Sequence, residues 1–556
     1  MLSSSSATAR RAPLLIAVLM LAPLWLTGMF GRGLWTPDEP READMAWRMS
    51  AQADRTLPQL AGTPFLEKPP LSYWMAGGAI AALGDSANAA RAPNLLYAVV
   101  VALAIAALAL AMELAAAPAL LAALVAASAL TAWRVSIWLA PDACLLAGCA
   151  LALLGTWLGL KAPRGAAKAA GYALAHLGAA VGFMAKSAPG WLVPGLALLV
   201  LVLWERRFGE LRRWELYAGL ALQALIIGPW LLAVAHGAHG AEALRTLFWN
   251  NLAGRFTQVA APAALDYTTG HRNTPGKYLL GLPLYLLPWT LLVLAALVRA
   301  WRRMRGDGAR GTAWRFALAS SVPFLGLLSV AATARDIYAA PALLGCGLLA
   351  GLWADEAGRA PSRLDRIAAL GTIVLVAAMA LACALALGVL AAAGAGAALP
   401  CVATALGVSA LAAGALGFAT RALRRGDLPR RPPHPAGRRS LAGSARARRA
   451  HSRRHPARAV RAARPGRDDD RDAGPRRRAL RNSHERRGRP ARHGRRLVRR
   501  AGSRGTRAGA AARPCGRSGH GVPRAPAPAP CRPGRRCRRR PRRRGRREDR
   551  AALRVA

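Results

Sequence analysis

The sequence predicts an all-α protein that crosses a membrane about twelve times. More than half of its 556 residues (54%) are hydrophobic, and the mean hydropathy is +0.21, which is typical of a membrane protein. The apolar residues also form runs close to the 20 residues that a helix needs to cross a bilayer. The twelve predicted spans are residues 13–30, 93–113, 118–135, 140–160, 170–185, 189–204, 214–235, 278–299, 314–332, 336–354, 367–392 and 398–418.

Basic residues next to these spans predict which side faces the cytoplasm. They precede the first span and follow the fourth, sixth, eighth and tenth. If every span crosses, the five groups share one face, and the positive-inside rule makes that face cytoplasmic. We therefore expect a multi-pass plasma-membrane protein with a cytoplasmic N-terminus. The groups are Arg10 and Arg11; Lys161, Arg164 and Lys168; Arg206, Arg207, Arg212 and Arg213; Arg299, Arg302, Arg303, Arg305 and Arg310; and Arg359, Arg363 and Arg366.

The composition changes abruptly near residue 421. Residues 421–556 hold 47 Arg, no Lys and 8 acidic residues, a net charge of +39, whereas residues 1–420 carry +12. This tail has no Phe, Trp, Tyr, Ile or Met, so it cannot bury enough apolar surface to fold alone, and we expect disorder. One interpretation is a basic tail for nucleic acid or anionic lipid. The absence of Lys and the GC-rich codons of Arg, Ala, Pro and Gly favour a frameshift product, so no nucleic-acid partner is expected.

The first predicted outer loop, residues 31–92, concentrates charged and aromatic side chains beside the membrane. It contains residues 35–42 (WTPDEPRE) and 64–74 (PFLEKPPLSYW), whose prolines fix backbone angles and shape turns. Ionisable groups beside a bilayer are costly and point to function. The plainer alternative is an interfacial loop anchored by its aromatic residues. The same face receives Asp142, Lys186, the long 236–277 loop and the Arg335–Asp336 pair.

Motifs on this face resemble those of the bacterial aminoarabinose transferase and protein O-mannosyltransferase group. These are integral-membrane glycosyltransferases of the GT-C type. A single Asp–Glu pair is a weak signal, but the ordered series is more specific. The motifs are residues 38–39 (DE), 67–70 (EKPP), 141–143 (PDA), 186–190 (KSAPG), 250–256 (NNLAGRF), 270–272 (GHR), Tyr278, 287–289 (LPW) and 335–341 (RDIYAAP).

The resemblance implies a GT-C-like domain over residues 1–420, with juxtamembrane helices and an active site facing the periplasm. Such enzymes sit in the inner membrane and move a sugar from a polyprenyl-phosphate carrier to an outer acceptor, such as lipid A or another cell-envelope glycan. The family usually ends with further spans and a soluble domain, which the Arg-rich tail of residues 421–556 replaces here.

Inverting transfer requires a base near the acceptor and positive charge near the departing phosphate. Asp38 is the candidate base, and Asp142 could orient the acceptor or support Asp38. The alternative for each Asp is to cap the helix that follows it, and for Asp38 both roles could hold. Lys186, Arg255 and Arg335 are candidates to hold the phosphate, since ammonium and guanidinium groups suit its oxygens. Lipid head-group contact is their alternative role.

Five further residues complete the predicted substrate-binding set. Lys68 could meet an anionic acceptor or the donor phosphate, and the resemblance adds Glu39, Glu67, His271 and Tyr338. Glu67 and His271 also have ligand types that suit a divalent metal, but two ligands do not define a site. The sequence therefore defines no certain cofactor, and it favours a site without a metal while leaving a divalent metal open.

Two other functions fit parts of the sequence. A transporter or flippase for a lipid-linked sugar would place charges inside spans near the midplane and often shows internal repeats. Here the charges gather at one membrane edge and no repeat is visible, which favours the enzyme. A truncated, inactive homologue is the second alternative, because the family's C-terminal part is absent.

Overall fold

The computed structural model describes residues 4–253, 273–331 and 335–392, which all belong to one unit of the chain. This part is almost entirely helical, and its only strands form the two-residue hairpin β1 (Gln59–Leu60) and β2 (Thr63–Pro64). The α-helices are α1 (Ser4–Met29), α2 (Asp38–Ala51), α3 (Leu71–Leu83), α4 (Ala87–Ala111), α5 (Ala116–Ser128), α6 (Leu130–Ile137), α7 (Pro141–Lys161), α8 (Ala166–Lys186), α9 (Pro189–Trp204), α10 (Trp214–His236), α11 (Gly240–Leu244), α13 (Lys277–Tyr285), α14 (Thr290–Arg303), α15 (Gly308–Ala319), α16 (Val322–Val330), α17 (Ala340–Ala357) and α18 (Arg363–Ala392). Short 3₁₀ helices, η1 (Phe208–Arg212) and η4 (Asp336–Ala339), and the π-helix η2 (Arg245–Ala253) connect them.

The predicted all-α, polytopic membrane fold is confirmed, although several predicted spans are broken. Helices occupy eleven of the twelve predicted segments, and the twelfth, residues 398–418, lies outside the described residues. Within the described part, six helices are long and apolar enough to cross a membrane, or seven if the bent pair α5–α6 is one span. That pair bends by 63°. Hydropathy does not detect such breaks, because a bend changes direction without changing composition.

The seam between α7 and α8 is lined by glycines, which lets the two backbones touch. A Cβ atom added at Gly148 would lie 2.6 Å from the amide nitrogen of Gly182 and 2.7 Å from the carbonyl oxygen of Gly178. Small residues allow this close approach of membrane helices. The antiparallel packing brings the first turn of α7 next to the last residue of α8.

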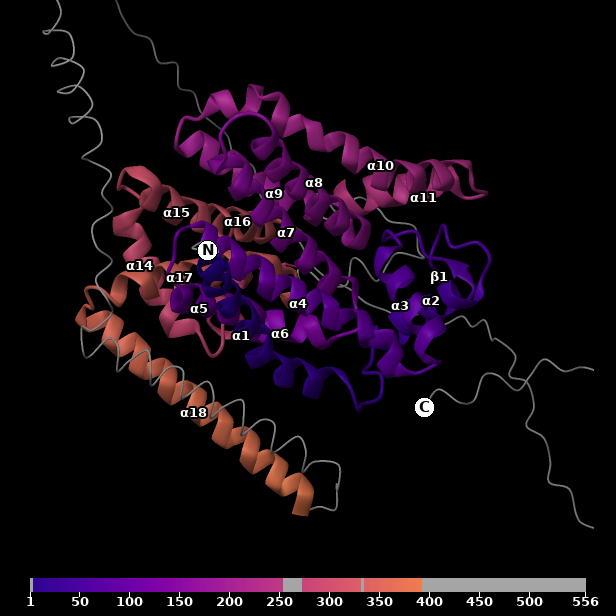
Figure 1. Cartoon of the computed structure of the whole chain (residues 1–556). Coiled ribbons are helices and arrows are strands. Elements are labelled where there is room, and N and C mark those ends of the chain that lie inside the picture. The colour runs from indigo at the N-terminus through magenta and orange to yellow at the C-terminus, as the bar shows by residue number, and fades with distance from the viewer. Residues whose placement is uncertain (1–3, 254–272, 332–334, 393–556) are drawn as a thin grey trace, which may run out of the picture. The chain divides into compact units, whose positions relative to one another are not determined.

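Helix α17 lies in the middle of the bundle and fixes the segment before it. Its side chains are buried along nearly the whole length, and its Gly347 and Gly351 lie against α5, where a side chain would collide. The preceding η4 is therefore held against α6 and α13. Helix α18, in contrast, packs on α14 and leaves most of its apolar surface exposed (Figure 1), as expected of a helix that faces lipid.

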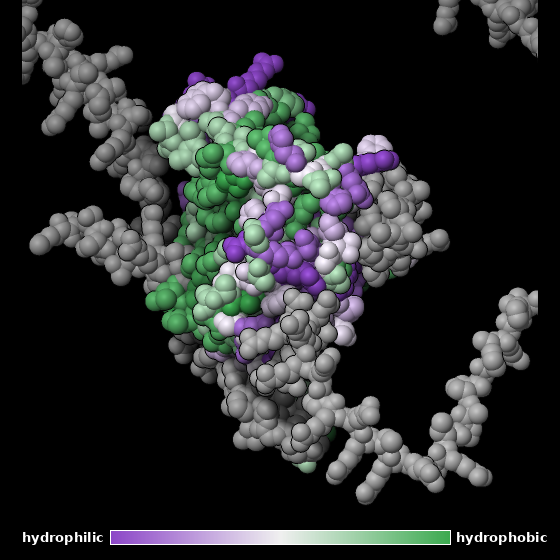
Figure 2. Space-filling view, turned by 90° about the vertical axis from the view of Figure 1, so that its right-hand side faces the viewer, coloured by the Kyte–Doolittle hydropathy of each residue, from purple (hydrophilic) through white to green (hydrophobic). Residues whose placement is uncertain are grey.

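Charged side chains gather at the two ends of α7. With 21 residues, this helix is about 30 Å long. The end at Lys161 carries the basic linkers that the sequence places in the cytoplasm, tied together by the ion pairs Lys168–Glu210, Arg315–Glu205, Arg310–Asp355 and Arg303–Glu356. The other end lies beside α2 and α3, and hydrophilic residues gather at the centre of the face that these elements present (Figure 2).

Candidate functional site

Three cation–carboxylate pairs form the centre of the site at the α2–α3 end. They join residues from α2, the linker before α3, both ends of the α7–α8 hairpin and the segment before η4, so partners lie up to 297 residues apart. Their side chains are buried or half-buried. The pairs are Asp38–Arg335, Asp142–Lys186 (2.5 Å between Oδ1 and Nζ) and Glu42–Lys68 (2.7 Å between Oε1 and Nζ).

Asp38 is the first residue of α2 and points its carboxylate at Arg335. The helix has Pro37 at its N-cap position, and Asp38 makes no capping hydrogen bond. The capping alternative for Asp38 is therefore wrong, because the side chain pairs with Arg335 instead. About 17% of the Asp38 side chain and 34% of that of Arg335 remain exposed, so a substrate can reach both groups.

Asp142 and Lys186 stand at adjoining helix ends. Asp142 lies in the first turn of α7, behind Pro141, and makes no capping bond, so the capping alternative is wrong here as well. Lys186 is the last residue of α8. A carboxylate at a helix N-terminus and an ammonium group at a C-terminus are both favoured by the helix dipoles. The Lys186 ammonium also lies 4.6 Å from the ring centre of Tyr338, which joins these residues to η4.

Lys68 faces Glu42, a residue that the sequence reasoning missed. Burial lowers the pKa of Lys68, but the attraction of Glu42 and the nearby Glu67 outweighs burial and raises it overall, so Lys68 is protonated. Glu67 is buried beside it. Helical spacing could have revealed Glu42, because it follows Asp38 by four residues and so shares its face of α2.

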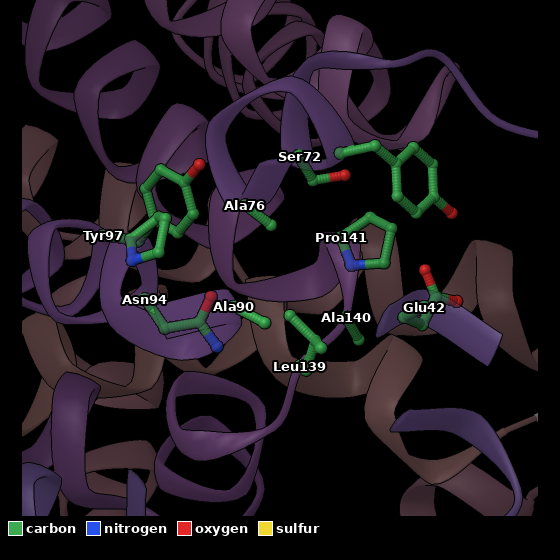
Figure 3. A pocket seen from close by; sticks show the side chains of 11 residues that line it. Glu42, Ser72, Ala76, Ala90, Asn94, Tyr97, Leu139, Ala140 and Pro141 are labelled. Atoms are coloured by element: carbon green, nitrogen blue, oxygen red, sulfur yellow. The ribbon is translucent and has the colours of Figure 1, made fainter. Parts of the chain in front are cut away.

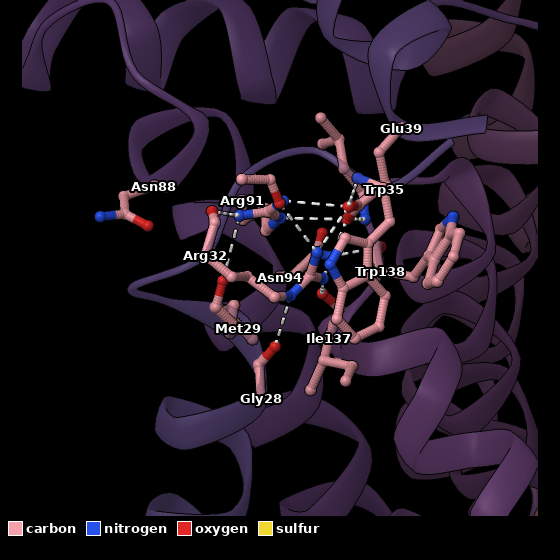
Figure 4. A network of polar contacts seen from close by, with 12 residues as sticks. Gly28, Met29, Arg32, Trp35, Glu39, Asn88, Arg91, Asn94, Ile137 and Trp138 are labelled. Atoms are coloured by element: carbon pink, nitrogen blue, oxygen red, sulfur yellow. Dashed lines mark hydrogen bonds and ion pairs between the residues drawn. The ribbon is translucent and has the colours of Figure 1, made fainter. Parts of the chain in front are cut away.

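Glu39 lies under the site, fully buried in a polar network (Figure 4). Its carboxylate accepts hydrogen bonds from both Arg32 and Arg91 and from the backbone amides of Trp35 and Leu139 (2.6–3.0 Å). Burial raises the pKa of Glu39, but these hydrogen bonds outweigh burial and lower it to about 2. The carboxylate is therefore ionised at neutral pH.

The network joins three segments that carry the site. Arg91, at the start of α4, also donates to the carbonyl oxygen of Gly33 (2.7 Å), and Arg32 donates to that of Ile137 (2.9 Å). Glu39 adjoins Asp38, and Leu139 precedes Asp142 by three residues. Through these hydrogen bonds Glu39 ties together the segments that carry both aspartates. Contact between Glu39 and substrate stays a prediction. The sequence offered one clue to Arg32 and Arg91: both are basic residues on the side that the positive-inside rule leaves acidic or neutral.

Two predicted site residues, Arg255 and His271, lie outside the described residues. The described part contains no cluster of three or more His, Cys, Asp or Glu side chains able to hold a metal ion. Because His271 is not among those residues, the structure does not test the combination of Glu67 and His271.

The fold and the site define a polytopic, all-α membrane protein with paired acids and cations at the end of α7 that lies beside α2 and α3. Comparison with solved structures shows the same fold in ArnT from Cupriavidus metallidurans bound to undecaprenyl phosphate. The TM-score is 0.58 at 20% sequence identity, and the match covers 75% of this chain and 73% of ArnT. The apo state of that protein matches with a TM-score of 0.54.

Sequence comparisons agree with the fold. The family described as dolichyl-phosphate-mannose-protein mannosyltransferase matches residues 67–232. Undecaprenyl phosphate-α-4-amino-4-deoxy-L-arabinose arabinosyl transferase 1 of Pseudomonas fluorescens is 29% identical over 65% of this chain and 62% of that protein. The corresponding transferase of Pseudomonas aeruginosa is 29% identical over 53% and 52%. The chain thus spans between half and two thirds of the length of these relatives. The chain is therefore similar in sequence to the bacterial aminoarabinose transferases and to the protein mannosyltransferase family over part of its length, and it shares the fold of ArnT.

Proposed function

We propose that this chain is an inner-membrane glycosyltransferase that moves a sugar from a polyprenyl-phosphate carrier to an acceptor outside the cytoplasm. The observation that carries the proposal is the set of three cation–carboxylate pairs at one membrane edge, within the fold of this family. Residues 1–420 would form the catalytic domain, with the N-terminus in the cytoplasm and the site facing the periplasm. Lipid A or another envelope glycan is the proposed acceptor.

In this proposal Asp38 is the general base of an inverting transfer. An acceptor hydroxyl attacks the anomeric carbon of the sugar, and the Asp38 carboxylate takes the hydroxyl proton. The bond between the anomeric carbon and the phosphate oxygen breaks, so the polyprenyl phosphate leaves with the electron pair. Arg335 and Lys186 hold the negative charge of that phosphate.

Because the cations are already paired with carboxylates, the donor phosphate is proposed to bind first and the base to be released afterwards. Before the donor arrives, the guanidinium of Arg335 is bound to Asp38. A phosphate competes for that guanidinium, because its oxygens match the donor fork of arginine. The competition releases the Asp38 carboxylate toward the acceptor. Asp142, paired with Lys186 in the same way, is proposed to orient the acceptor.

A flippase for the same lipid is the alternative function. Transporters place their ionisable groups near the bilayer midplane, where discontinuous helices meet. Here five of the six residues of the three pairs lie at helix ends or in linkers, and Glu42 lies in the second turn of the short helix α2, which favours chemistry at the membrane surface over transport.

The Asp38→Asn variant tests this function. We expect it to insert normally but to lose transfer by roughly 10²-fold or more, the contribution of a general base. Transfer is measured with purified full-length chain in liposomes containing a polyprenyl-phosphate sugar and lipid A. Asp85→Asn is the matched control, because Asp85 is exposed in the linker between α3 and α4. Wild-type activity of Asp38→Asn would refute the assignment of the base.

A further inference from the structure

A small pocket opens beside the Glu42–Lys68 pair, between α2, α3, α4 and the start of α7 (Figure 3). Glu42 lies at one end, Tyr97 at the other, and Ser72 and Pro141 between them. The space open to the centre of a water-sized molecule is about 10 Å³, which is close to the least that holds one water. The pocket therefore fits a single functional group and excludes a whole sugar ring.

Four residues that line this pocket have a buried polar atom without a hydrogen-bond partner among the described residues. These atoms are Glu42 Oε2, Ser72 Oγ and the hydroxyl oxygens of Tyr73 and Tyr97. The Tyr73 hydroxyl lies near the Glu42 carboxylate but makes no well-directed hydrogen bond to it. Buried polar groups in native proteins are almost always hydrogen-bonded. Four unsatisfied atoms on residues around one cavity indicate a polar guest.

The pocket adjoins the proposed reaction site from two directions. Glu42 lines it; its Oε1 accepts the hydrogen bond from Lys68, and its Oε2 has no hydrogen-bond partner among the described residues. Pro141, on the opposite wall, directly precedes Asp142. A sugar held beside Asp142 and Lys68 would therefore have one substituent within reach of the pocket.

Resting on the proposed function, we propose that this pocket receives one compact hydrogen-bond donor, a hydroxyl or a protonated amine, of the transferred sugar. A carboxylate oxygen can only accept, so the guest must donate to Glu42, whereas the hydroxyls of Ser72 and Tyr73 can donate or accept. The size of the pocket excludes an acetamido group. The charge of Glu42 excludes a sugar carboxylate. The site thus selects neutral or amino sugars over N-acetylated sugars and uronic acids.

The test uses full-length chain in liposomes and a panel of synthetic polyprenyl-phosphate pentoses. In each donor, one ring hydroxyl is replaced by hydrogen, amine or acetamide, and kcat/KM is measured for every donor. We expect one ring position at which the wild type accepts hydroxyl or amine and rejects hydrogen and acetamide. At that position alone, Ser72→Ala and Tyr73→Phe should each reduce the preference for hydroxyl or amine over hydrogen by roughly 10-fold, the effect of one hydrogen bond.

A third variant and a control separate specificity from folding. Glu42→Gln keeps the side-chain shape but adds an amide donor, so it should reduce the preference for amine more than that for hydroxyl. Tyr217→Phe removes an exposed tyrosine hydroxyl from α10 and should change nothing. If the pocket variants lower kcat/KM equally for all donors, the pocket holds only structural water and this proposal is overturned. If the wild type transfers no donor, and a thermal-shift measurement on it shows no donor binding, the proposed function fails together with the proposal for the pocket.

Discussion

Replacing Glu39 by alanine removes the acceptor of six hydrogen bonds beneath the site. The guanidinium of Arg91, which is fully buried, would lose its anionic partner. Breaking a buried ion pair by removing one member costs about 3–5 kcal/mol, because an uncompensated charge remains. The pKa gives a consistent figure: lowering it from 4.5 to about 2 corresponds to about 3 kcal/mol, at about 1.4 kcal/mol per pKa unit.

The assay is unfolding of the purified protein in mixed detergent micelles, compared with Glu113→Ala. Glu113 is exposed after α4, so its removal should change the free energy of unfolding by no more than about 0.5 kcal/mol. The stabilisation by Glu39 should also depend on pH. Because its pKa is lowered in the folded protein, the contribution is complete above about pH 4.5 and disappears as the pH falls toward 2. Equal stability of the two variants at pH 7 would refute the role of Glu39 as a buried anchor.

Three other predictions concern the seam, the second ion pair and the tail. Gly148→Ala should destabilise the protein by about 1–3 kcal/mol, since the added Cβ would collide with the backbone of α8. Gly195→Ala should stabilise it by up to about 1 kcal/mol, because a Cβ added there has no described atom within 4 Å. Thermal unfolding of both variants tests this contrast. Lys186→Met should cost about 3 kcal/mol by leaving Asp142 unpaired. Adding Asp142→Asn should recover most of that stability but no transfer activity, and recovery of activity would show that the pair is only structural. A chain ending at residue 420 should melt at the temperature of the full chain in detergent, because the Arg-rich tail lacks the apolar side chains to pack; a large drop would show that the tail is part of the fold.

The sequence by itself determined the class of the protein, the positions of its helices and one set of polar groups at one membrane edge. Apolar runs of span length require helices, because a backbone inside a bilayer must satisfy its own hydrogen bonds. Asp38, Asp142, Lys186 and Arg335 could be singled out because topology did not explain their charged side chains, and the family resemblance added Tyr338. The structure brings these five together, while their roles in substrate binding and catalysis remain proposals.

Only the tertiary structure decided how these groups are used. The partner of each carboxylate depends on distances between helices that are remote in sequence, as in the pair of Asp38 and Arg335. Glu39 has the same charge and nearly the same sequence position as Asp38, yet one is sealed under the site and the other faces it. Helical rotation separates neighbouring residues by about 100°, and the packing of α4 and the α6–α7 linker then determines which one is buried. The pocket beside Glu42 likewise exists only because four segments meet there.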